Sequence, residues 1–283
     1  MIDLAWLALR VLSFVLTLQA AGMALYRLRF ARDSAQVATV IAADTRRAAL
    51  AAVIVVAAQI PLEPAYLAGE LSAVLDRDTA GFALLSAGPE LGVRLLGVVL
   101  LVLGGRPRAA PRTALPLAGS ALAVLSFALA GHVPHGDYAA LLVPLLLIHA
   151  GIVAWWFGAL WPLYRVARLA EPRELTQLLT RFSRSAVWLV PLIPIAGVAI
   201  AAGLLSGVAA LAHPYGLLLL AKGGMFLLAL GLAVVNRQRL LPAIARGERT
   251  AVARLRGTLI GEYLLLCAAL AATAIMSGVY FPG

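Results

Sequence analysis

The stretch GLLLLAKGGMFLLALGLAVV, residues 216–235, decides the class of fold, because Lys222 is the only charged residue in it. A helix needs about 20 mostly apolar residues to cross the hydrocarbon core of a membrane. Tyr215 extends the run by one residue, so a membrane-spanning helix is predicted over 215–235. A second clear run, 257–279, follows a basic segment and is predicted to span the membrane as well.

The whole chain has the same apolar character. Of its 283 residues, 63% are hydrophobic and the mean hydropathy is +0.95, whereas an ordinary soluble domain is about half apolar. The sequence therefore predicts an all-α polytopic membrane protein, with residues 1–283 in one transmembrane domain made of an N-terminal part, 1–110, and a second part, 111–283. Eight spans are expected, at residues 4–27, 48–70, 88–105, 114–131, 139–164, 184–208, 215–235 and 257–279.

The charges predict the orientation of the chain. The net charge is +10, and 19 arginines lie in the breaks after spans one, three, five and seven, whereas the other breaks contain only Arg77. Short cytoplasmic loops of membrane proteins are enriched in Lys and Arg, so both termini are predicted to be extracytoplasmic. The basic residues are spread over several loops rather than gathered in one patch, which argues against a nucleic-acid partner.

Ionisable residues inside membrane helices are costly and mark candidate functional positions. Arg10 and Arg94 lie at similar depth in spans one and three, and Glu63 or Glu70 of span two is expected within ion-pair reach of one of them. Two interpretations remain open: structural ion pairs that join the first three helices, or an acidic lining that draws cations inward. The polar residues of span two are spaced four, three and four apart, which places them on one helix face: Gln59, Glu63, Tyr66 and Glu70.

Two histidines interrupt the apolar sequence between spans four and five, in the stretch AGHVPHGDY (130–138). Its glycines and proline predict a turn, which would let His132 and His135 approach one metal ion. Imidazole binds copper, nickel and zinc. His213 lies in another break on the predicted outer side, where a single histidine is often incidental. The one cysteine, Cys267, excludes an internal disulfide and a cysteine-cluster metal site.

Within the spans, His149 is the strongest single candidate ligand, because an imidazole buried in lipid needs a partner, a ligand or water. Trp156 follows seven residues later on the same predicted face. Met225 and Met276 lie in spans seven and eight, and their thioether groups suit reduced copper.

The fifth predicted span, IHAGIVAWWFGALWPL (148–163), resembles the His-then-Trp-x-Gly-Gly-Leu motif of the copper resistance protein D (CopD) family, with matches at His149, Trp156 and Gly158. Segments 181–203 and 213–242 resemble the next parts of that family, and AGHVP resembles its Gly-His element. The resemblance covers about 130–283. Further matching positions are Tyr215, Gly216, Lys222, Asn236, Arg237, Pro242 and Glu262.

The resemblance implies copper uptake from the periplasm to the cytoplasm across the bacterial inner membrane, alongside a separate periplasmic copper-binding protein of the CopC type. The outer histidines would capture the ion, with His132 best placed to pass it to His149. No GxxxxGK[ST] loop is present, so transport is expected to be passive or ion-coupled, without enzymatic activity. The residues expected to have structural or gating roles are Arg10, Glu63, Glu70, Arg94, Trp156, Lys222, Asn236, Arg237 and Glu262.

Glu262 is expected to contact Asn236 or Arg237, because spans seven and eight are joined by a short loop. A b-type haem protein is the main alternative, since histidines on facing helices bind haem as axial ligands. That alternative requires a second buried histidine, and only His149 lies within a predicted span. A scaffold or sensor without transport is a third possibility.

Overall fold

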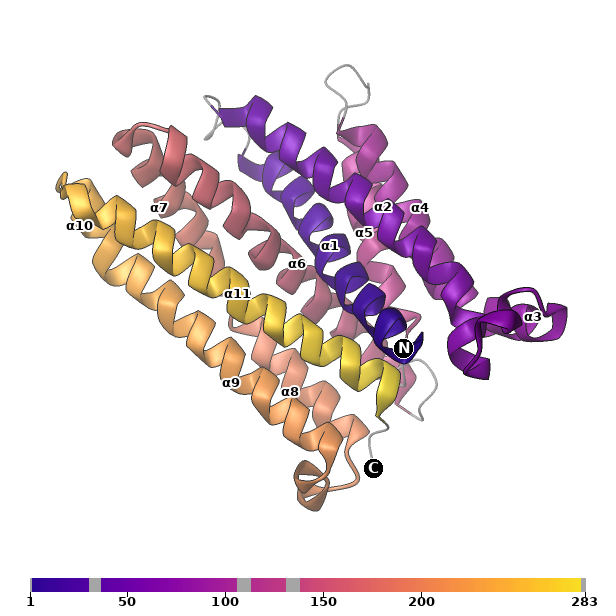
Figure 1. Cartoon of the computed structure of the whole chain (residues 1–283). Coiled ribbons are helices and arrows are strands. Elements are labelled where there is room, and N and C mark those ends of the chain that lie inside the picture. Colours follow the sequence, from indigo (N-terminus) through magenta and orange to yellow (C-terminus); the bar gives the residue numbers. More distant parts are fainter. Residues whose placement is uncertain (1, 31–36, 106–112, 131–137, 281–283) are drawn as a thin grey trace.

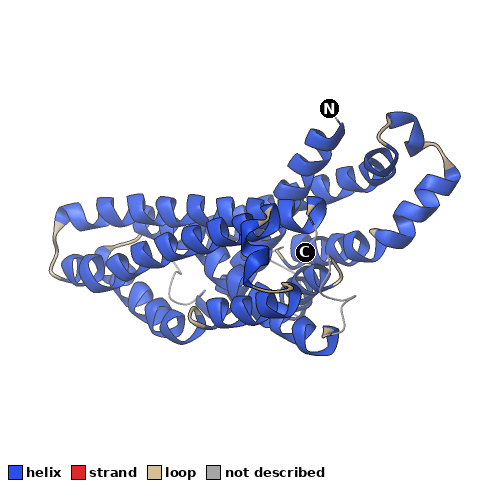
Figure 2. Ribbon diagram, turned by 90° about the horizontal axis from the view of Figure 1, so that it is seen from below, coloured by secondary structure: helices blue, strands red, loops and turns tan. Residues whose placement is uncertain are grey.

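The computed structural model describes residues 2–30, 37–105, 113–130 and 138–280, which are helical throughout apart from short connections and contain no strand (Figures 1 and 2). This confirms the predicted all-α class. The α-helices are α1 (Ile2–Phe30), α2 (Ala38–Ala68), α3 (Arg77–Ser86), α4 (Gly88–Gly104), α5 (Ala114–Ala128), α6 (Ala139–Leu169), α7 (Pro172–Leu189), α8 (Leu192–Leu204), α9 (Pro214–Val235), α10 (Leu241–Ala245) and α11 (Arg249–Val279). Shorter turns are η2 (Leu71–Val74), η4 (Val208–Ala212) and the π-helical η5 (Asn236–Leu240).

Six helical segments in the described part of the chain are long and apolar enough to cross a membrane: α1, α2, α6, α7 with α8, α9 through α10, and α11. Helices α3 and α4 would form a seventh, although they are bent by 66° at their junction. Helix α5 has 15 residues, which is short for a span. The chain is therefore a multi-pass membrane protein, and the count of eight spans stays a prediction.

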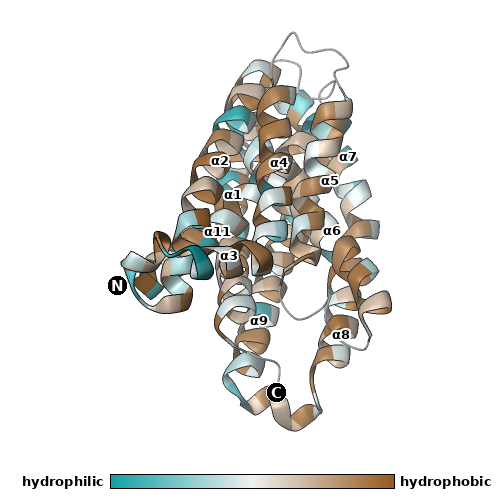
Figure 3. Ribbon diagram, turned by 90° about the vertical axis from the view of Figure 1, so that its right-hand side faces the viewer, coloured by the Kyte–Doolittle hydropathy of each residue, from teal (hydrophilic) through white to brown (hydrophobic). Residues whose placement is uncertain are grey.

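Helix α1 lies at the centre of the bundle, where it packs against α2, α4, α5, α6 and α11 (Figure 1). The first turn of α1 and the last turn of α11 lie at the same end of the bundle. Apolar residues extend along the outer faces of the helices (Figure 3). On α9, for example, Leu217, Leu227 and Leu228 are each more than half exposed. Such faces are expected to contact lipid.

Glycines allow α1 and α6 to approach closely. A Cβ atom on Gly22 would lie 1.8 Å from the carbonyl oxygen of Ala154, and one on Gly158 would lie 2.4 Å from the Cα of Gly22. Small residues at membrane helix interfaces bring backbones close enough for extensive van der Waals contact. This contact fixes α6, and with it His149, against the central helix.

Helix α2 ends earlier than the predicted span. It stops at Ala68 because Gly69 adopts a left-handed conformation (φ 76°), a common way to end a helix. Glu70 therefore lies beyond the helix, exposed, at the start of η2. The expectation that Glu70 continues the helical row of Gln59, Glu63 and Tyr66 is wrong.

The long breaks of the sequence contain helices that were not expected. Helix α7 begins at Pro172 rather than near residue 184, and a break at Val190 and Pro191 separates it from α8.

Helix α3 begins with a capping bond from the backbone N–H of Thr79 to Asp76. Hydrogen bonds from Thr79 lower the pKa of Asp76. The stabilisation from this cap is therefore present at neutral pH and is lost as the pH falls through that lowered value.

Candidate metal path

His149 is held in one orientation by helix α8. Its Nδ1 atom lies 2.9 Å from the carbonyl oxygen of Ile193. A carbonyl oxygen only accepts, so Nδ1 carries the hydrogen, and in the neutral ring Nε2 keeps its lone pair. Histidines that bind metals commonly donate their other ring N–H to a carbonyl in this way. The contact therefore leaves Nε2 available as a ligand.

The surroundings of His149 come from α8 and α9. A Cβ atom on Gly197 would lie 3.3 Å from Cε1 of the ring, so a glycine gives the imidazole its space. Lys222 of α9 is close enough to interact electrostatically with the ring. Of the two candidate methionines, Met276 is buried in α11 and Met225 is half-buried in α9. His149 and Lys222, which are far apart in sequence, thus lie in one region of the bundle.

Glu262 forms a hydrogen-bonded latch with the end of α9. Its carboxylate is 2% exposed and accepts a hydrogen bond from Nδ2 of Asn236, the first residue of η5. Thr258 donates its hydroxyl to Oδ1 of the same asparagine. The expected contact between Glu262 and Asn236 is confirmed, whereas no ion pair joins Glu262 to Arg237 among the described residues. Pi-helical turns such as η5 often mark functional sites.

A cavity of about 580 Å³ lies between α6, α7, α9 and α11, beside this latch. Trp156, two helical turns after His149, lines the cavity, together with Asn236 and Glu262. Most of the remaining wall is apolar, and exposed Arg237 lies at the edge. A carboxylate and an amide oxygen in an otherwise apolar cavity are suited to interact with a passing cation.

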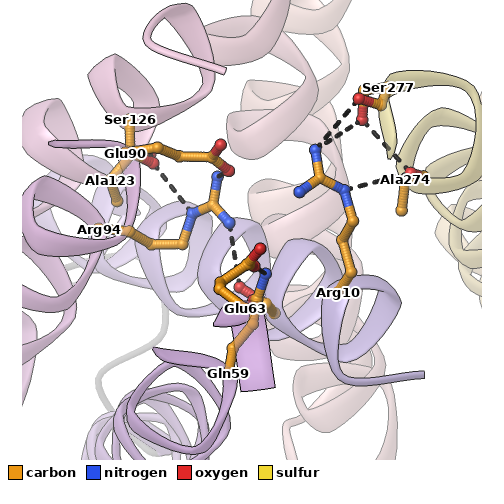
Figure 4. Close-up of polar contacts among 10 residues, drawn as sticks. Arg10, Gln59, Glu63, Glu90, Arg94, Ala123, Ser126, Ala274 and Ser277 are labelled. Atoms are coloured by element: carbon orange, nitrogen blue, oxygen red, sulfur yellow. Dashed lines mark hydrogen bonds and ion pairs between the residues drawn. The ribbon is translucent and has the colours of Figure 1, made fainter. Parts of the chain in front are cut away.

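Arg94 of α4 is the centre of a second, more rigid polar cluster (Figure 4). It is fully buried, forms an ion pair with Glu90, and donates to the hydroxyl oxygens of Ser126 and Ser13 at 3.1 Å each. The rings of Phe14 and Phe127 lie 5.0 and 4.6 Å from its guanidinium carbon. Each of the three guanidinium nitrogens thus has a protein partner, which is the behaviour of a structural residue.

Glu63 does not form a direct ion pair with either arginine among the described residues. It accepts a hydrogen bond of 3.0 Å from Nε2 of Gln59, and it interacts with Arg94 at longer range. Arg10 instead donates to the carbonyl oxygen of Ala274 at 3.3 Å and to the hydroxyl of Ser277 at 3.2 Å, which ties α1 to α11 (Figure 4). These polar residues therefore come from five helices, α1, α2, α4, α5 and α11, and they are joined more through hydrogen bonds than through ion pairs.

Of the loop histidines, His132 and His135 lie outside the described residues, and His213 is exposed at the start of α9. Within the described part of the chain, no three His, Cys, Asp or Glu side chains gather as a metal site.

Several polar partners were missed by sequence reasoning. Ser13, Ser126 and Thr258 are single hydroxyl residues in apolar runs, and hydroxyl residues are common in helices, so nothing in the sequence distinguished them. Asp44 of α2 was also missed: its carboxylate is 2.9 Å from Arg165 Nε, and it accepts a hydrogen bond from Trp161 at 3.1 Å. These three residues meet because α2 and α6 both pack against α1 and their side chains reach one another.

The fold and its polar positions define a polytopic helical membrane protein with a histidine inside one spanning helix. The family description "Copper resistance protein D" matches residues 176–276, and "Copper resistance protein D-like, N-terminal domain" matches residues 1–140. The chain therefore belongs to the copper resistance protein D family, and the match extends well into the N-terminal half, where no motif was apparent. No curated protein and no solved structure matches significantly. Family membership links the chain to copper resistance and transport.

Proposed function

We propose that this chain carries copper ions from the periplasm to the cytoplasm across the bacterial inner membrane, by passive or ion-coupled transport. The observation that supports this most is His149, an imidazole inside a spanning helix with Nδ1 bound to Ile193 and Nε2 available. The cavity lined by Trp156 and Glu262 lies further along the same helix and offers a continuation of the path.

The proposed path requires one orientation of the chain in the membrane and a protein that supplies the copper ion. The lopsided distribution of arginines supports eight spans with both termini in the periplasm. The ion would enter near His132, His135 and His213 and be supplied by a separate periplasmic protein of the CopC type. Haem binding gains no support, because within the described part of the chain His149 is the one histidine inside a spanning helix, and His213 lies just before α9.

Copper accumulation in cells tests this function. We expect His149→Ala to lower accumulation strongly at matched protein levels, whereas Ile148→Ala, a neighbouring and half-exposed position on α6, should leave it unchanged. Because copper binds only the neutral imidazole, accumulation should also weaken at an external pH low enough to protonate the histidines of the path. Normal accumulation by His149→Ala would exclude His149 from the path.

A further inference from the structure

A second pocket, of about 270 Å³, opens between α6 and α11. Trp161, Tyr164 and Arg168 line it from α6, and Ile260 and Tyr263 line it from α11. It is separate from the cavity beside Glu262, since Leu160 and Leu259 form a wall shared by the two. We call it the Arg168 pocket, and the copper path proposed above makes no use of it.

The walls of the Arg168 pocket change in character with depth. Helix α6 ends at Leu169 and α11 begins at Arg249, so the two helices run antiparallel and share this end of the bundle (Figure 1). Arg168 is therefore at the rim, whereas Trp161, Ile260 and Tyr263 are two turns deeper. A helix of 31 residues is about 46 Å long, which exceeds the ~30 Å hydrocarbon core. The last turn of α6 is thus expected in the headgroup layer.

Among the described residues, no carboxylate forms an ion pair with the arginine at the rim. The neighbouring Arg165 is already paired with Asp44, with Nε 2.9 Å from Oδ2, although this contact is not aligned as a hydrogen bond. Arg168 is exposed, its guanidinium carbon lies 5.9 Å from the centre of the Tyr164 ring, and it makes no ion pair within the described part of the chain. The pocket therefore combines one available guanidinium with an aromatic and aliphatic floor.

We propose that the Arg168 pocket binds an anionic phospholipid. The guanidinium of Arg168 holds the lipid phosphate, since its planar fork matches phosphate oxygens. Trp161 and Tyr164 lie at the level of the glycerol backbone, as aromatic residues do at membrane interfaces. The pocket is too small for a whole lipid, so the acyl chain continues along the lipid-facing side of α11, where Ile260 and Leu264 are 44% and 61% exposed. Basic pockets between transmembrane helices bind anionic headgroups in this way.

Native mass spectrometry of the full chain tests this site with phosphatidylglycerol and phosphatidylcholine of identical acyl chains. We expect the wild type to retain phosphatidylglycerol preferentially, and Arg168→Gln to weaken that binding about tenfold or more, because a charge-assisted hydrogen-bond pair is lost. Arg173→Gln removes an exposed arginine of α7 outside the pocket and should bind like the wild type.

A second variant tests the contribution of the apolar floor of the Arg168 pocket to lipid binding. Ile260→Trp fills the floor without changing the charge and should also weaken retention, with thermal melting showing that each variant is folded. If inorganic phosphate alone displaced the bound phosphatidylglycerol, the pocket would be a simple anion site that does not recognise the lipid chain, and the proposal would be overturned. Equal retention of the two lipids by the wild type, or unchanged binding by Arg168→Gln, would overturn it too.

Discussion

At the scale of single residues, buried polar side chains in this protein differ in how fully they are satisfied. Arg94 meets Glu90, Ser13 and Ser126 and is enclosed by aromatic rings. His149 binds one carbonyl and keeps its second nitrogen available. A group whose nitrogens all have protein partners holds helices together, whereas a group with a free lone pair can bind a ligand. This contrast agrees with a structural role for Arg94 and with the proposed role of His149 in the copper path.

Arg94→Gln is expected to destabilise the protein strongly. The substitution leaves the buried carboxylate of Glu90 without its ion-pair partner, which typically costs about 3–5 kcal/mol. Thermal melting in detergent measures the effect, with Arg173→Gln at an exposed position as the control. A melting temperature equal to that of the wild type would contradict the structural role of the Arg94–Glu90 ion pair.

At the scale of elements, the bundle depends on a few close helix contacts. Helices α1 and α6 meet through Gly22 and Gly158, and α9 meets α11 through Asn236 and Glu262. The first contact is set by backbone shape and the second by hydrogen bonds. Matched substitutions on the same helices can test both contacts.

Gly158→Ala should destabilise the protein, whereas Gly151→Ala on the same helix should be tolerated. The added Cβ at residue 158 would lie 2.4 Å from backbone atoms of α1, while nothing lies within 4 Å of a Cβ at residue 151. Forced overpacking typically costs about 1–3 kcal/mol. Melting of the two variants compares them directly, and equal stabilities would contradict the close α1–α6 contact.

The hydrogen bond between Asn236 and Glu262 predicts that substitutions of these two residues have non-additive effects on the free energy of unfolding. Glu262→Ala and Asn236→Ala should each destabilise the protein by about 1–3 kcal/mol, because each leaves a buried partner unsatisfied. The double variant should lose less than the sum of the two, with a coupling of about 0.5–3 kcal/mol. Chemical denaturation of the three variants measures the coupling. Strictly additive losses would show that the two side chains do not stabilise each other.

At the scale of the whole molecule, the chain folds around α1, and the polar cluster and the His149 region lie on different sides of this helix. Helices α2, α4 and α5 enclose the Arg94 cluster with α1, whereas α6, α8, α9 and α11 surround His149 and the cavity. The Arg94 cluster thus lies in a half that supports the fold, and the proposed copper path lies in the other half.

The proposed topology places α3 and α7 on opposite sides of the membrane. In a Cys267→Ala background, a cysteine at Asp78 should react with a membrane-impermeant thiol reagent added to the periplasmic side. A cysteine at Arg173 should react only after the membrane is permeabilised. Both positions are exposed, so accessibility within the protein is comparable. Labelling of both cysteines from the same side would overturn the topology.

The sequence by itself determined the helical membrane class, the family, and the contact between Glu262 and Asn236, because hydropathy, motif spacing and a short connecting loop are local properties. It failed where an end or a partner depends on the rest of the chain. Gly69 ends α2 before Glu70, which a hydropathy pattern does not show, and α7 extends far beyond its apolar part.

Only the tertiary structure decided which polar groups meet. The partners of Arg94 come from α1, α4 and α5, Ile193 reaches His149 across 44 residues, and Trp161 reaches Asp44 across 117. In an apolar environment each polar group must find a partner wherever helix packing provides one. Since packing follows the shapes of whole helices, the identity of a partner is not contained in the local sequence around either residue.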